Sequence, residues 1–235
     1  KSLEIRQTTI LENISNLTKR LSFLESSKSL PKAVEKVKDA IYAEFGQQVG
    51  FDFIHVQDIH YYDYSLEKRK DLLGIESTHM LAKTLMIENA GYSTQIAKQF
   101  VSDESAPLYS RYYFVIVSYT TPLSGPKLTK FLRKLANTNN QRRQGFKVGR
   151  KKANATMCEP EKALELTQFP FNGMTFVGGN VNVTSKIPII ISDSLLNENE
   201  IYLGGGLIDW KMRLDIKSLL KSKTNRGIFV GNIIQ

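Results

Sequence analysis

The residue of greatest chemical interest in the sequence is Lys83, because it lies in an apolar segment that is predicted to be a strand. The segment covers residues 79–87 and reads His-Met-Leu-Ala-Lys-Thr-Leu-Met-Ile. Side chains alternate between the two faces of a strand, so Lys83 shares a face with Leu81, Leu85 and Ile87. An unpaired ammonium on an apolar face is unfavourable unless its head reaches water. Two interpretations stay open: an edge-strand lysine that reaches solvent, or a cation that lines a pocket and binds an anion or a polarised carbonyl.

Other catalytic signatures are missing from the sequence. It has no P-loop, no dinucleotide-binding fingerprint and no zinc-ligand pattern, so we predict neither a metal nor a cofactor. Cys158 has no evident base to activate it, and we therefore expect a packed thiol rather than a nucleophile. The three glycines at 204–206 could bind phosphate, although glycines after a strand are more typical of a close backbone approach.

The composition is that of a globular protein with an excess of positive charge. The chain has 235 residues, of which 41% are hydrophobic, and its net charge of +9 suits an acidic partner such as nucleic acid. No apolar run approaches the roughly 18 residues of a membrane helix, so no membrane partner is expected. A single cysteine excludes an intrachain disulfide and fits a reducing compartment, which predicts a cytoplasmic protein.

The cations are concentrated in one segment. Residues 127–152 carry ten of them and no acidic residue. Phosphate neutralisation dominates the affinity of proteins for nucleic acids, so this density favours a polyanion contact over a solvated helix face. The candidate contacts are Lys127, Lys130, Arg142, Arg143, Lys147, Arg150, Lys151 and Lys152.

Hydrophobic periodicity divides the chain into an N-terminal helix and a larger domain. In residues 1–28 apolar side chains recur every seven residues, which indicates a heptad helix for a partner or a second copy, although the stripe could pack on the chain itself. The domain follows at 31–235. We predict helices at 31–45, 65–73, 127–136, 159–166 and 216–220, and strands at 51–56, 79–87, 111–119, 187–191, 201–203 and 228–233. Many strands with few, unevenly placed helices favour the α+β class.

Four groups of segments occur in an order that is specific as a set. The first is 73–75 followed by 82–85, a helix-ending glycine and then Lys-Thr-Leu; the second is the strand 112–117 with the basic helix after it. The third is 158–167 leading into 173–178 and 186–191, and the fourth is 201–205 leading to Leu214 and 219–220. Together they resemble the YbaK-type aminoacyl-tRNA deacylases, the prolyl-tRNA-editing domain superfamily. The resemblance covers about residues 47–235 and leaves the heptad helix outside.

This resemblance implies a mixed α/β fold around a curved, barrel-like mixed sheet with outer helices. The implied activity is trans-editing hydrolysis of mischarged tRNA, alanyl- or cysteinyl-tRNA for proline, with the terminal adenosine and amino acid in a pocket. Lys83 falls on the family's functional lysine and would favour the transition-state charge, while water or the substrate's own thiol attacks. The alternative is a non-catalytic tRNA-binding or scaffold subunit whose heptad helix recruits a synthetase or a second copy.

The substrate-binding positions that the resemblance implies lie mostly in one loop. They are Asn172, Gly173, Met174, Thr175, Phe176 and Gly178, together with Gly205, Asp209 and His60. The family's Gly-x-x-x-Pro loop falls on residues 172–176, with Asn172 in place of the first glycine and Phe176 in place of the proline. Asparagine tolerates a positive φ, so the loop shape could persist. Phenylalanine could narrow or rebuild the pocket, and Asp209 is only the nearest counterpart of the family's late acidic residue.

Overall fold

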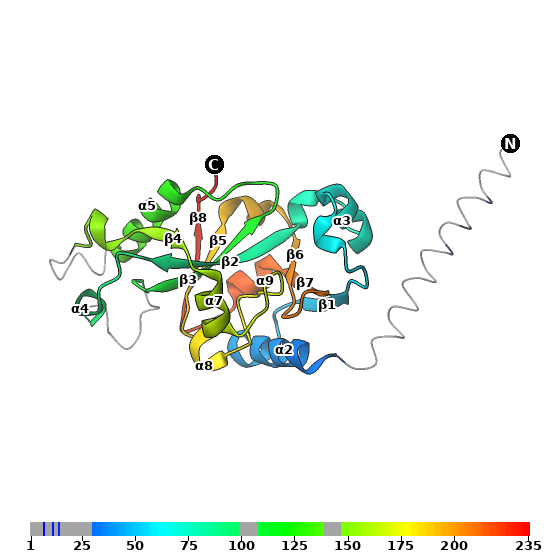
Figure 1. Cartoon of the computed structure of the whole chain (residues 1–235), viewed down its shortest axis with the longest axis horizontal. Helices are drawn as coiled ribbons and strands as arrows, with labels where there is room; N and C mark the ends of the chain where they lie inside the picture. Colours follow the sequence, from blue (N-terminus) through cyan, green and yellow to red (C-terminus); the bar gives the residue numbers. More distant parts are fainter. Residues whose placement is uncertain (1–6, 8–10, 12–13, 15–29, 99–107, 139–146) are drawn as a thin grey trace.

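The structure is a computed structural model that describes residues 7, 11, 14, 30–98, 108–138 and 147–235 (Figure 1). The predicted heptad helix 1–28 lies outside the described residues apart from Gln7, Leu11 and Ile14, each of which is helical. The heptad arrangement therefore stays a prediction, and the fold described below is that of the larger domain.

The described strands form two sheets. One sheet has five strands in the order β4-β2-β3-β5-β8, and the other has three in the order β1-β7-β6. The strands are β1 (Phe51–His55), β2 (Ala82–Asn89), β3 (Tyr112–Ser118), β4 (Ala155–Met157), β5 (Ile189–Ser192), β6 (Glu200–Gly204), β7 (Trp210–Asp215) and β8 (Ile228–Gly231). An isolated bridge between Leu81 and Tyr202 joins the two sheets.

The larger sheet is mixed, which confirms the predicted fold class. β2 pairs antiparallel with β3 and β4, whereas β3 pairs parallel with β5 and β5 pairs parallel with β8. The smaller sheet is antiparallel throughout. Within the part of the chain that the structure covers, strand pairing closes no barrel, so the barrel-like curvature is still only a prediction.

The helices begin and end close to the predicted positions. They are α2 (Lys32–Phe45), α3 (Leu66–Leu73), α4 (Thr94–Ala97), α5 (Gly125–Ala136), α7 (Pro160–Thr167), α8 (Val181–Thr184) and α9 (Ile216–Lys221), with 3-10 turns η1 (Tyr61–Asp63), η2 (Thr78–Met80), η4 (Arg150–Lys152) and η5 (Asp193–Asn197). The Ser65 side chain caps the start of α3, and Gly74 ends it in the left-handed conformation at a φ of 64°. Sequence periodicity did not reveal α4, α8, β4 or β7.

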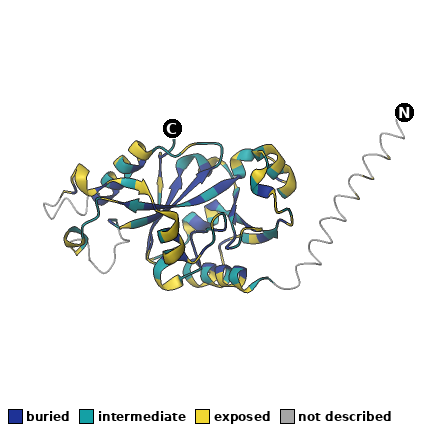
Figure 2. Cartoon of the chain, in the orientation of Figure 1, coloured by how far each residue is buried: buried dark blue, intermediate teal, exposed yellow. Residues whose placement is uncertain are grey.

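The five-stranded sheet is covered on both faces, as the continuous apolar run of β3 predicts. Phe114 and Ile116 belong to one core, with the apolar stripe of α2, and Tyr113, Val115 and Val117 belong to a second core with α5. Figure 1 shows α5 on one side of the sheet and α2 and α8 on the other. Figure 2 shows buried strands between helices whose outer faces are exposed.

The segment around Lys83 differs from its prediction at the start. Residues 78–80 form the turn η2, because the Ser77 hydroxyl accepts a hydrogen bond from the His79 amide, and the strand begins at Ala82. Side chains do alternate along β2, but the face of Ala82, Thr84 and Met86 is the buried one, whereas Lys83 and Leu85 are half-buried.

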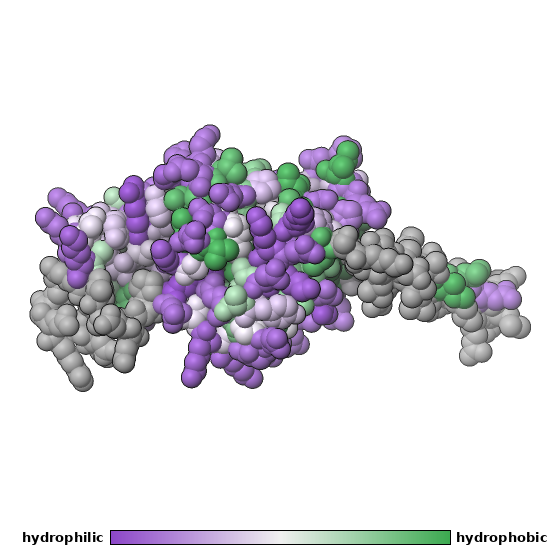
Figure 3. Space-filling model, turned by 90° about the horizontal axis from the view of Figure 1, so that it is seen from below, coloured by the Kyte–Doolittle hydropathy of each residue, from purple (hydrophilic) through white to green (hydrophobic). Residues whose placement is uncertain are grey.

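Where the structure describes the chain, no helix is long and apolar enough to span a bilayer. Seen from below, the surface is mostly hydrophilic, and its apolar side chains form small, separate patches (Figure 3). This face therefore offers no broad apolar surface.

Candidate active site

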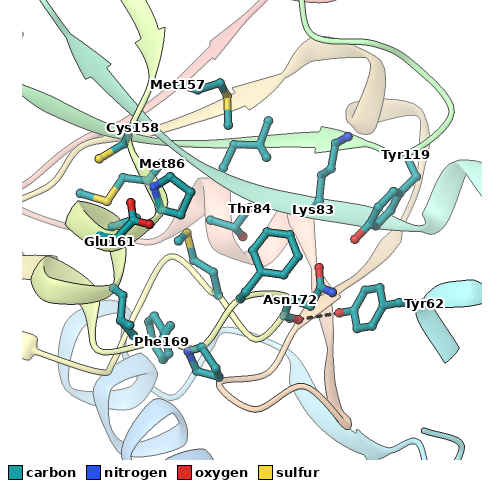
Figure 4. Close-up of a pocket in the computed structure, with 18 residues that line it drawn as sticks. Tyr62, Lys83, Thr84, Met86, Tyr119, Met157, Cys158, Glu161, Phe169 and Asn172 are labelled. Atoms are coloured by element: carbon teal, nitrogen blue, oxygen red, sulfur yellow. Dashed lines mark hydrogen bonds between the residues drawn. The ribbon is translucent and has the colours of Figure 1, made fainter. Parts of the chain in front are cut away.

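A cavity of about 440 Å³ opens beside the edge of β2. Its walls come from β2, η1, α7, the loop 169–174 and the end of β6. Figure 4 shows Lys83 and Tyr119 at one end of the cavity and Met157 and Cys158 at the other. Segments far apart in the sequence thus converge on one hollow.

The cavity exists because one edge of β2 is left open. β4 pairs only with Ile87, Glu88 and Asn89, and the Cys158 amide adds one hydrogen bond to the Met86 carbonyl at 3.0 Å. Backbone groups alternate in direction along a strand, so those of residue 84 point to the same open side as those of Met86. Among the described residues, no strand pairs with residue 84 on this side, so its backbone groups face the cavity.

Thr84 adds a side-chain hydroxyl to this wall. It lines the cavity and is 7% exposed. Its Oγ1 is buried and has no hydrogen-bond partner among the residues that the structure includes. Buried hydroxyl groups normally find a partner, so a polar group bound in the cavity would satisfy this one.

Lys83 occupies the end of the cavity next to Tyr119. Its Nζ lies 5.1 Å from the centre of the Tyr119 ring, a distance at which a cation is attracted to the ring face. No carboxylate of the described ranges forms an ion pair with Lys83, and its side chain is half-buried. The ammonium in the wall is thus unneutralised by protein acids.

The loop that the resemblance singled out runs along the opposite wall. Asn172 has a φ of 65°, which confirms the expected positive φ, and Gly178 has a φ of 85° with its Cα hydrogens against Val37 of α2. Gly204 of β6 touches the Met174 carbonyl, so a Cβ there has no room. This contact agrees with the close backbone approach predicted for residues 204–206.

The predicted substrate-binding residues do not all reach the cavity. Asn172 and Met174 line it, whereas Gly173, Thr175, Gly178 and Gly205 are buried beside it and are not part of the wall. Asp209 and His60 are exposed on the surface, and each forms a side-chain hydrogen bond: Asp209 with His55 at 2.9 Å, and His60 with Asp63 at 3.2 Å.

Phe176 lies in the core. It is 0% exposed, and its ring centre lies 5.9 Å from that of Phe45. The expectation that phenylalanine narrows the pocket is therefore wrong for this position, because the ring points toward Phe45 of α2. The backbone carbonyl of Phe176 accepts a hydrogen bond from Arg226 at 2.8 Å.

Cys158 lines the cavity as a protonated thiol. It is 6% exposed, and burial raises its pKa, with smaller contributions from Glu88 and Glu159. A raised pKa disfavours the thiolate, which is the nucleophilic form. The described part of the chain also holds no group of three or more His, Cys, Asp or Glu side chains placed to bind a metal ion.

Sequence reasoning missed a cluster of tyrosines and cations at the Lys83 end. The Arg69 guanidinium lies 5.4–5.6 Å from the ring centres of Tyr61, Tyr62 and Tyr119 and donates to the Tyr62 and Tyr64 carbonyls. The aromatic run 60–64 was visible in the sequence, but its folding against Arg69 depends on α3. The Nζ of Lys211, on β7, lies against the rings of Tyr61 and Tyr62 and also belongs to this cluster.

The rim of the cavity is unusually apolar. Phe171, Met157 and Leu164 line it and are 80%, 57% and 53% exposed, respectively. They come from a loop, β4 and α7, so three separate segments each leave a large apolar side chain at the mouth. Convergent exposed apolar groups at a cavity are typical of a binding site.

The basic segment lies at the other end of β2. Lys127, Lys130, Lys147 and the η4 cations are exposed, while Arg142 and Arg143 fall outside the described residues. Asn89 fastens η4 to the strand: its Nδ2 donates to the Lys152 carbonyl at 3.2 Å, and its Oδ1 accepts from the Asn154 amide at 2.8 Å. Asn89 lies six positions along the strand from Lys83, about 20 Å at roughly 3.3 Å per residue.

Comparison with known proteins gives likenesses of structure. No family model and no curated protein matches the sequence. Among solved structures, a candidate trans-editing enzyme for prolyl tRNA synthetase matches with a TM-score of 0.59 and 17% identity, covering 88% of this chain and 99% of the other. A scaffold protein from computational epitope grafting matches with a TM-score of 0.55 and 16% identity over 88% and 99% of the two chains. A hypothetical protein matches with 0.54 and 15% over 85% and 99%. At these identities the likeness concerns the fold alone.

Proposed function

We propose that the chain is a hydrolase that removes the amino acid from mischarged aminoacyl-tRNA, acting in trans on alanyl- or cysteinyl-tRNA for proline. The observation that carries this proposal is the Lys83 ammonium in the wall of a largely apolar cavity, where no described carboxylate forms an ion pair with it. The trans-editing description of one solved structure with this fold supports it.

The reaction needs little from the protein. Water adds to the ester carbon, the bond between that carbon and the ribose oxygen breaks, and the ribose oxygen takes a proton, which releases the amino acid and free tRNA. Negative charge develops on the carbonyl oxygen in the transition state, and a fixed cation beside it lowers the barrier. Lys83 is the cation of the cavity wall that can serve this role.

Thr84 and the open edge of β2 suit the polar part of the substrate. Thr84 lines the same cavity as Lys83, but its side chain leaves the opposite face of β2 (Figure 4). Its Oγ1 has no hydrogen-bond partner among the described residues. Hydrogen bonds to this hydroxyl would hold the ester or the terminal ribose in the cavity, and correct placement contributes strongly to rate.

The apolar wall of the cavity suits the apolar part of the substrate. Met86, Phe169 and Met174 surround the interior, which a small acyl group would occupy. At the rim, the exposed ring of Phe171 offers a face on which an unpaired base can stack. The exposed cations of the basic segment supply contacts for phosphates further along the RNA.

A deacylation panel tests this proposal. Wild-type protein is incubated with alanyl-, cysteinyl-, seryl- and prolyl-tRNA, and release of the amino acid is followed. Lys83→Met should lose ~100-fold or more in kcat, the loss typical of removing one electrostatic donor, with an unchanged circular dichroism spectrum. Lys217→Met is the matched control, since this exposed lysine of α9 lies away from the cavity.

The alternative function is a non-catalytic tRNA-binding or scaffold subunit. Phe176 favours it, because the position of the family's loop proline has become part of the core. Full activity of Lys83→Met would refute the electrostatic role. Inactivity of the wild type on every tRNA of the panel, with tRNA binding retained, would select the scaffold function.

A further inference from the structure

Lys211 is a lysine buried in the second sheet, where its Nζ contacts Tyr62 of the cavity wall. It lies in β7 and is 3% exposed. Lysine is almost never fully buried unless it is paired. In the ranges that the structure describes, no carboxylate forms an ion pair with its Nζ. The burial of this charge therefore needs another explanation.

The Lys211 ammonium is held by a carbonyl, a hydroxyl and two rings. Its Nζ donates to the Ile208 carbonyl at 2.6 Å and to the Tyr62 hydroxyl at 2.9 Å. It also lies 4.7 Å and 4.5 Å from the ring centres of Tyr61 and Tyr62. The ammonium is thus fixed against η1, the segment that supplies Tyr62 to the cavity wall.

The hydrogen bond of Tyr62 continues into the substrate loop. Its hydroxyl donates to the Asn172 carbonyl at 2.5 Å, the bond drawn in Figure 4. Asn172 holds a positive φ, a conformation that asparagine adopts more readily than most non-glycine residues. A continuous chain of hydrogen bonds therefore runs from β7 to the cavity wall through Lys211, Tyr62 and Asn172.

The charge of Lys211 determines which way the Tyr62 proton points. A charged ammonium has three donors and no acceptor, so the Tyr62 oxygen must accept from it and its own proton must go to Asn172. A neutral amine has a lone pair and can accept the Tyr62 proton instead. Deprotonation of Lys211 would then release the Asn172 carbonyl.

The groups around Lys211 set the pH of this change. Burial lowers the pKa of Lys211 to about 8; Asp209, on the turn before β7, opposes the shift, and Arg69 of α3 adds to it. Tyr61 and Tyr62 of η1 face the ammonium as well, and burial raises the pKa of both, so both stay neutral. Lys211 is therefore the group of this cluster that titrates near pH 8.

We propose that Lys211 is a positioning residue of the cavity: it acts through the Tyr62 hydroxyl to hold the Asn172 loop in the shape that receives substrate. The catalytic part of this inference rests on the proposed function, whereas the positional part does not. Lys211 touches no substrate in this scheme, and its effect on the loop is strongest while it is protonated.

Methyl NMR of the full chain tests the positional part without any substrate. Met174 lies two residues after Asn172 in the loop and lines the cavity. Met86 and Met157 line the cavity from β2 and β4. With 13C-methyl methionine, the Met174 resonance of the wild type should shift with a midpoint near pH 8. The resonances of Met86 and Met157 should not follow this midpoint and serve as internal references.

Two variants decide whether Lys211 causes that shift. Lys211→Leu removes the titrating group without adding a methionine signal, and Tyr62→Phe removes only the hydroxyl and keeps the ring. Both should abolish the pH-dependent shift of Met174. If Lys211→Leu does not fold, Tyr62→Phe alone is decisive. A Met174 shift that persists with the same midpoint in Tyr62→Phe overturns the proposal.

Kinetics test the catalytic part separately. If the wild type deacylates tRNA, Tyr62→Phe should lower kcat/KM ~10- to 100-fold, because the loop is misplaced rather than the reacting groups removed. The activity of the wild type should decline above pH 8, and the remaining activity of Tyr62→Phe should lack this decline. An unchanged kcat/KM and pH profile would refute this part. An inactive wild type would count against the proposed function, while the NMR result still decides the role of Lys211.

Discussion

Lys211 and Arg226 are two buried cations whose charges are balanced in different ways. Arg226 is 1% exposed, and its Nε lies 2.6 Å from Oε1 of Glu44, an acid on α2. Its Nη1 donates to the carbonyls of Phe176 and Thr184 at 2.8 Å and 2.6 Å. Lys211 has one carbonyl, one hydroxyl and two aromatic rings in place of a carboxylate.

The difference separates a structural cation from one that can change state. Burial lowers the pKa of Arg226 only to about 10, since Glu44 opposes the shift, so the guanidinium stays charged near neutral pH. Burial lowers the pKa of Lys211 to about 8. A buried cation with an acid ties segments together, whereas a buried cation without one can lose its proton close to physiological pH.

Removing each cation should have unequal effects on stability, and this is the largest expected difference. Arg226→Met leaves Glu44 without its partner and should lower the free energy of unfolding by about 3–5 kcal/mol. Lys211→Leu leaves no described carboxylate without a partner and should lower the free energy of unfolding by less than about 2 kcal/mol. Urea denaturation at pH 7 measures both. Equal losses would show that the two sites are balanced alike, and Glu44→Gln added to Arg226→Met should restore part of the loss.

Stability should also depend on pH through Lys211. Below about pH 8 the lysine is protonated in both the folded and the unfolded chain, so its contribution is constant. Between pH 8 and its ordinary pKa of 10.5 the unfolded chain binds more protons, so the free energy of unfolding rises with pH, by up to roughly 3 kcal/mol. Urea denaturation at pH 7, 8, 9 and 10 measures the rise. The difference between wild type and Lys211→Leu isolates it, and parallel curves for the two proteins would contradict it.

The exposed cations of η4 form a third class, which should affect binding rather than stability. Reversing all three charges of Arg150–Lys152 to glutamate should weaken tRNA binding ~10- to 100-fold at low salt and make its salt dependence shallower. Binding titrations at several KCl concentrations measure both quantities. Reversal of the exposed Lys32, Lys36 and Lys186, which lie away from η4, is the matched control. Equal losses in the two triple variants would mean that only net charge matters.

The smallest effect is expected for an exposed ion pair. Lys162 Nζ lies 2.8 Å from Oε2 of Glu165 on the outer face of α7. Solvent screens such a pair, so Lys162→Ala should leave the urea midpoint unchanged within error. A clear destabilisation would show that distance to a carboxylate, rather than burial, separates the classes of cation.

Local patterns in the sequence predicted the parts of the fold that depend on local physics. The stripe of α2, the two-sided burial of β3, the end of α3 at Gly74 and the positive φ of Asn172 all follow from periodicity or backbone preference. The sequence leaves two interpretations of Lys83 open; its position in the cavity wall favours the second, and its functional role stays a prediction.

The rest of the fold and of the candidate site depends on long-range contacts, which no local sequence pattern encodes. Lys211 meets Tyr62 across 149 positions of sequence, and β7 carries alternating basic residues that resemble an exposed strand. Phe176 could not be assigned to the core before α2 and its Phe45 were placed beside it. Long-range packing therefore explains why the sequence did not reveal Lys211 and why Phe176 was predicted at the pocket rather than in the core.

The strand β2 carries the cavity at one end and, through Asn89, the basic turn at the other. A hydrogen-bonded strand hardly stretches, so β2 keeps the cavity and the exposed cations of η4 about 20 Å apart. Under the proposed function, an RNA end shorter than that span would reach only the cavity. The length of the RNA end, as well as the identity of the amino acid, should then affect binding.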